Sequence, residues 1–220
     1  MEQKNRKKKQ RPVLWILPVL FLLSIGLGFW QRDNIAAFLA GWNSGSAEIE
    51  QRFEDNRQMV RDAVEDLPVR DLTEEEREML RSGELAGAQM EALLVDTEEQ
   101  DPYRKALSEL IARIYVLRET YIIQLDGMEA QAKEEYGRFS EKEKSKSRLT
   151  KWAAEYVSAA TKMENECDDE MDIIIDDMTQ LIKENNGDLS LLDKVIDGYA
   201  NEKSLKKSMY TAKLRERGLL

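Results

Sequence analysis

No proline follows Pro102 in this chain of 220 residues, and apolar residues recur beyond it at alternating spacings of three and four. This spacing places them along one face of a helix, and over such a length it is typical of helices that pack in bundles with coiled-coil-like contacts. The sequence therefore predicts an all-α fold with three long helices. The three apolar series are Leu107, Leu110, Ile114, Leu117, Tyr121, Leu125, Met128, Ala132 and Tyr136; Leu149, Trp152, Tyr156, Ala160, Met163, Cys167, Met171, Ile174, Met178 and Leu181; and Leu192, Val195, Ile196, Tyr199, Leu205, Met209 and Ala212.

Helix start and stop signals separate these three series. Asp101 followed by Pro102 is typical of an N-cap and a first helical residue. The polar residues 140–147 predict a turn, and the motif Asn185-Asn186-Gly187-Asp188 predicts a helix end of the left-handed type followed by a new cap. Because the first two helices have nearly equal lengths and a short connection, we expect an antiparallel hairpin that the third helix completes. The result is a three-helix bundle over residues 101–220.

The composition excludes several classes of protein. With 11 Gly, 4 Pro and 7% aromatic residues, the chain favours long helices over a β-sandwich. It has no histidine, which excludes Ser-His-Asp catalysis and His-ligated metals, and one cysteine, which excludes an intramolecular disulfide. No phosphate-binding loop, nucleophile elbow or dinucleotide fingerprint is present in the sequence. We therefore expect no enzymatic activity, no catalytic residues, no cofactor and no metal.

The net charge of −10 is divided sharply along the chain. In residues 1–11 six Lys and Arg against one Glu sum to +5, residues 12–31 carry no charge, and the remainder sums to −15. The apolar run would span roughly 27 Å as a helix, close to the ~30 Å hydrocarbon core of a bilayer. We expect a basic cytoplasmic tail over 1–11 and an uncleaved transmembrane anchor over 12–31, with a cleaved signal peptide as the alternative. The positive-inside rule then places the N-terminus in the cytoplasm and everything from residue 32 onward outside it.

Residues 32–100 are expected to form a juxtamembrane helical region with short helices and an acidic linker. Its first residues carry an apolar stripe that indicates either a helix in the membrane interface or a continuation of the anchor helix. Further on, the sequence predicts a helix over 47–66, another from a capping box toward Leu80, a third over 84–95, and an acidic linker over 96–101. The residues that carry these signals are Ile35, Phe38, Leu39 and Trp42 in the stripe, Ser46 as an N-cap, and Thr73 with Glu76 in the capping box.

The densest charge of the chain lies between positions 164 and 177. We expect these carboxylates to form a solvated face, because a straight helix cannot fold its own side chains around one ion and no Ca²⁺-loop spacing accompanies them. The basic residues of the last helix are expected to pair with this acidic helix inside the bundle. The acidic set is Glu164, Glu166, Asp168, Asp169, Glu170, Asp172, Asp176 and Asp177, and the basic set is Lys203, Lys206, Lys207, Lys213, Arg215 and Arg217.

Cys167 falls within the second apolar series, between Met163 and Met171. This position predicts a buried and inert thiol. The alternative is an exposed thiol that crosslinks two copies of the chain.

Three short segments resemble a family of uncharacterised bacterial single-pass membrane proteins from anaerobic Gram-positive bacteria. They are residues 110–118 (LIARIYVLR), 167–172 (CDDEMD) and 202–207 (EKSLKK). The resemblance extends over the anchor and most of the region beyond it. It implies a membrane location and a helical architecture, and it implies no established activity and no functional residue.

Taken together, the sequence predicts a membrane-anchored extracytoplasmic helical scaffold or protein-interaction module in the cell envelope. Its expected partners are membrane lipid, through residues 12–31, and a protein of the envelope, with a homo-oligomer left open. Nucleic acid is excluded by charge and compartment. Two alternatives stay open: a sensory or regulatory helical module that binds a small ligand, and an unfamiliar enzyme that uses its carboxylates.

Overall fold

The computed structural model describes residues 44–96, 98–99, 101–140 and 146–216. Within them the chain is all-α, as the sequence predicts, apart from one isolated β-bridge between Val69 and Val95. The helices are α3 (Ser46–Ala63), α4 (Glu74–Ser82), α5 (Gly87–Leu94), α6 (Pro102–Arg138), α7 (Lys146–Glu184) and α8 (Ser190–Glu216).

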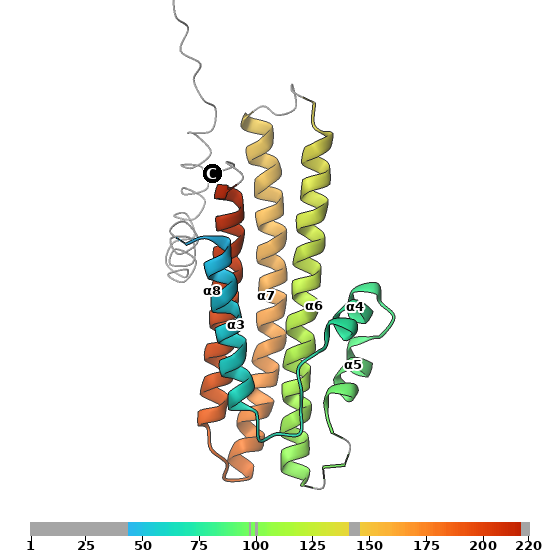
Figure 1. Ribbon diagram of the computed structural model, residues 1–220, viewed down its shortest axis with the longest axis vertical. Helices are drawn as coiled ribbons and strands as arrows, with labels where there is room; N and C mark the ends of the chain where they lie inside the picture. Colours follow the sequence, from blue (N-terminus) through green and yellow to red (C-terminus); the bar gives the residue numbers. More distant parts are fainter. Residues whose placement is uncertain (1–43, 97, 100, 141–145, 217–220) are drawn as a thin grey trace, which may run out of the picture.

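Four long helices run along the length of the molecule and two short ones lie beside them (Figure 1). The long helices α6 and α7 form the expected antiparallel hairpin, and α8 runs antiparallel to α7. Helix α3 lies antiparallel along α8, while α4 and α5 pack against the first half of α6. The start of α3, the end of α6, the start of α7 and the end of α8 all lie at the same end of the bundle.

Most local start and stop signals act where the sequence predicts them. Thr73 and Glu76 form a reciprocal capping box at the start of α4, and the Asp101 carboxylate accepts the N–H of Tyr103 in the first turn of α6. At the end of α7 the left-handed residue is Asn186, with φ of 53°.

Three predicted boundaries were wrong by a few residues. Helix α3 has Gly45 as its N-cap, with Ser46 as its first residue, and it ends at Ala63. The helix expected from residue 84 begins at Gly87, because Gly83 ends α4 in a left-handed conformation and the chain needs residues 84–86 to turn. Local signals locate these helices but do not fix their last turn, which depends on the packing of neighbouring elements.

The main core surrounds the first half of α6, which is buried on more than one face. Ile114 and Leu117 of the predicted series are buried against α7, and Ile111, Tyr115 and Val116 are buried as well. The second buried face exists because α4 and α5 cover α6 from the side opposite the hairpin. The 3/4 spacing alone indicates only one buried face, so this part of the core was not predicted.

A second core cluster joins α3 to the second half of α8. Its members are Ile49, Phe53, Leu205, Met209 and Ala212. The two helices approach closely at Gly198, where a Cβ atom would collide with the Val60 side chain, and the Asn56 amide donates a hydrogen bond of 2.9 Å to the Gly198 carbonyl. The described part of the bundle thus has four long helices where the sequence predicts three, because α3 supplies the partner for the apolar side of α8.

No helix in the described ranges is long and apolar enough to cross a membrane. The predicted tail over 1–11, the anchor over 12–31 and the apolar stripe at 35–42 lie outside the described residues, as do most of the turn over 140–147 and the side chains of Lys213, Arg215 and Arg217.

Two alanine substitutions test the burial pattern of the hairpin. The Ile114 side chain is 8% exposed in the core, whereas Asp169 is exposed on α7. Ile114→Ala should lower the free energy of unfolding by about 2–5 kcal/mol, because it loses buried methyl groups and leaves a cavity. Asp169→Ala should change it by no more than about 0.5 kcal/mol. Chemical denaturation of both variants measures the difference, and a larger loss for Asp169→Ala would contradict this assignment of the two faces.

Candidate functional site: a charge cluster between four helices

The structure places Cys167 in the core, which confirms the buried thiol. Its side chain faces Tyr199 of α8, whose hydroxyl donates to the sulfur at 3.3 Å. Burial raises the pKa of the Cys167 thiol to about 11, so the thiol stays protonated and unreactive near neutral pH.

The predicted pairing between the basic helix and the acidic helix is confirmed for Lys203 and Lys207. Lys203 contacts Asp168 at 2.6 Å and Glu164 at 3.0 Å, and Lys207 contacts Glu164 at 2.6 Å. Burial alone would lower the pKa of Lys203, but its hydrogen bonds to Asp168 and Glu164 outweigh this effect and the pKa is raised. Lys206 turns instead to Asp126 of α6, at 3.6 Å.

The acidic set of α7 is consequently divided between two environments. Glu164 and Asp168 lie on the side of α7 that faces α8, where Lys207 and Lys203 pair with them. The expectation that these two carboxylates belong to a solvated face was therefore wrong. The other members are exposed, and among the residues that the structure describes no group of carboxylates gathers as a metal site. The exposed members are Glu166, Asp169, Glu170, Asp172, Asp176 and Asp177.

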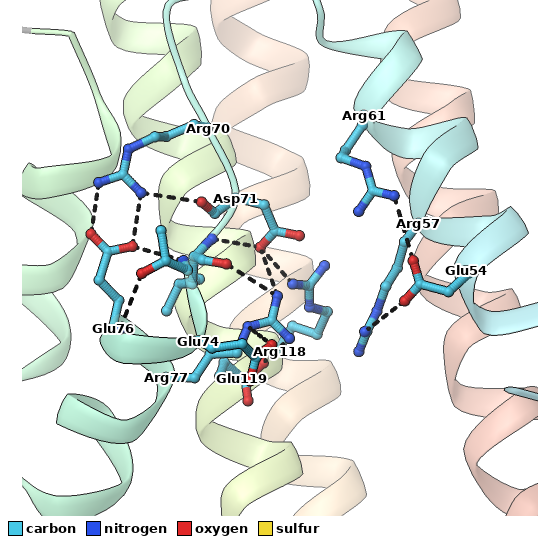
Figure 2. Close-up of polar contacts among 12 residues, drawn as sticks. Glu54, Arg57, Arg61, Arg70, Asp71, Glu74, Glu76, Arg77, Arg118 and Glu119 are labelled. Atoms are coloured by element: carbon cyan, nitrogen blue, oxygen red, sulfur yellow. Dashed lines mark hydrogen bonds and ion pairs between the residues drawn. The ribbon is translucent and has the colours of Figure 1, made fainter.

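The most unusual feature of the interior is a set of six ionisable side chains that the sequence alone did not single out. Their side chains are only 4–19% exposed, and they come from α3, the α3–α4 loop, α4, α6 and α8. Figure 2 labels the members from α3, the loop, α4 and α6. Three are cations and three are anions, so the set is neutral. We call it the central charge cluster: Arg57, Asp71, Arg77, Arg118, Glu119 and Glu202.

Arg118 of α6 lies at the middle of this cluster. Its Nη2 donates to Asp71 Oδ1 at 2.8 Å, and its Nε lies 3.9 Å from Glu202 Oε1. Burial alone would lower the pKa of Arg118, but the nearby carboxylates of Glu202, Asp71 and Glu119 outweigh it and the pKa is raised. The guanidinium also lies over the Tyr115 ring, 5.2 Å from the ring centroid. Arg118 is therefore held as a cation by three carboxylates from three different elements.

The two other arginines extend the cluster to the outer helices. Arg57 of α3 donates to Glu202 of α8 at 3.4 Å. Arg77 of α4 lies 3.7 Å from Asp71 and 3.6 Å from Glu119 of α6. Each long-range contact joins two elements, so the six side chains connect α3, α4, α6, α8 and the α3–α4 loop.

Beside the cluster, hydrogen bonds of Arg70 connect the two short helices α4 and α5. Its guanidinium makes two hydrogen bonds to Glu76, of 2.8 and 2.6 Å (Figure 2). It also donates to the carbonyl of Asp71 at 3.3 Å and to that of Leu93, at the end of α5, at 3.2 Å. The hydrogen bond from Arg70 lowers the pKa of Glu76 to about 2, against the opposing effect of burial. Both groups are therefore charged at neutral pH.

The cluster is neutral but not fully saturated with hydrogen bonds. Among the described residues, the Nε atoms of Arg57, Arg77 and Arg118 and the Oε2 atom of Glu119 are buried without a hydrogen-bond partner. Burying such groups costs free energy that the ion pairs only partly return. The arrangement is thus suited to fixing which helices lie together. Its six charged groups form ion pairs with one another.

A signal for this cluster exists in the sequence, but it is weak. Arg118 and Glu119 continue the same helical face as the buried Ile111 and Tyr115, at offsets of seven and eight residues from Ile111. A charged pair on a buried face suggests buried partners. The partner Asp71 lies 47 residues away in the chain, and nothing in the sequence identifies it.

Comparisons of the chain with models of protein families, with curated proteins and with solved structures found no match. The resemblance of residues 110–118, 167–172 and 202–207 to a membrane protein family stays a prediction.

A substitution of Arg118 tests whether the cluster holds the helices together. Arg118→Met keeps much of the side-chain length but leaves Asp71 and Glu202 without their central cation, so it should lower the free energy of unfolding by about 3–5 kcal/mol. The matched control is Arg113→Met on the same helix, whose ion pair with Asp177 at 3.4 Å is exposed and should contribute no more than about 1 kcal/mol. Urea denaturation measures both, and equal losses would contradict the role given to the cluster.

Proposed function

We propose that the chain is a membrane-anchored, extracytoplasmic helical scaffold that presents a rigid bundle to a protein partner in the cell envelope, and that it has no catalytic activity. The observation that carries this proposal is the contrast between the interior of the bundle and the outer face of α7. The ionisable groups of the central charge cluster are paired with one another, whereas no basic helix of the described chain lies opposite the exposed carboxylates Asp169, Asp172 and Asp176 of α7.

That outer face has a defined composition. Asp169, Asp172, Ile173 and Asp176 recur at offsets of three, four and seven, which places them on one stripe of the helix, and all four are exposed. Ile173 is 57% exposed, the highest value among the exposed large apolar residues of the described chain. An apolar side chain framed by carboxylates suits a partner that offers an apolar pocket with basic residues around it.

The ligand-binding and enzymatic alternatives have less support. A depression of about 430 Å³ between α3 and the start of α8 is open to solvent, and the charged Asp55, Asp62 and Lys194 are among the residues that line it, whereas small-molecule sites are enclosed. The pKa of Glu76 is lowered, which is the opposite direction from that of a general acid.

The membrane part of the proposal rests on residues 1–31 and is tested by labelling. In a Cys167→Ser background, a membrane-impermeant maleimide should label Ser44→Cys in intact cells and should not label Gln3→Cys until the cells are lysed. Labelling of Gln3→Cys alone in intact cells would reverse the orientation. Protection of both positions would contradict export of the bundle.

The partner part is tested by a photo-crosslinking amino acid at position 173. We expect a crosslinked species of one discrete mass in intact cells, which weakens severalfold when Asp169→Asn and Asp172→Asn remove two framing charges. The matched control is the same amino acid at Leu93 of α5, which is 51% exposed on another face. No crosslinked species at 173, or the same species at both positions, would contradict the proposal.

A further inference from the structure

We draw no further inference here: the strongest candidate, the open depression between α3 and the start of α8 around the exposed Met59 side chain, carries none, because Asp55, Asp62 and Lys194 line it and nothing in the described part of the structure shows what covers it.

Discussion

Three arginines and three carboxylates lie between α3, α4, α6 and α8 with side chains that are only 4–19% exposed, and their ion pairs join these four helices. Arg118 contacts Asp71 and Glu202, which belong to segments 131 positions apart in the chain, and Arg57 and Arg77 bring in the outer helices. A helix that slipped along its neighbour would leave at least one of these charges buried alone, which is costly. The apolar contacts of the two core clusters supply the favourable burial, and the charges select one register among those that apolar surfaces alone would tolerate.

This register gives the bundle two different ends and one distinctive side. Because α3 and α8 are fixed at their middle by Asn56, Gly198, Arg57 and Glu202, the hairpin of α6 and α7 is left to project beyond them. The exposed stripe around Ile173 lies along α7.

The parts of the fold that sequence predicts are those that depend on neighbours in the chain. The N-cap at Asp101 and the capping box at Thr73 act within four residues, and the face of α6 that carries Ile114 follows from helical spacing. The parts that it does not predict depend on distant partners. Arg118 and Asp71 are 47 residues apart, and the amide of Asn56 finds the carbonyl of Gly198 across 142 residues. A charged residue on a buried face signals that a partner exists, but only the packing of α3 and α4 reveals which one.

The central claim is that the charge cluster makes these helices one cooperative unit, and native-state hydrogen exchange of the full chain in increasing denaturant tests it most directly. Amides beside the cluster in residues 53–60 of α3, 112–120 of α6 and 196–204 of α8 should exchange through one opening, with the same free energy and the same dependence on denaturant. Exchange of the α3 amides at a clearly lower free energy than those of α6 would show that α3 opens on its own. That result would contradict a cluster that holds the four helices together.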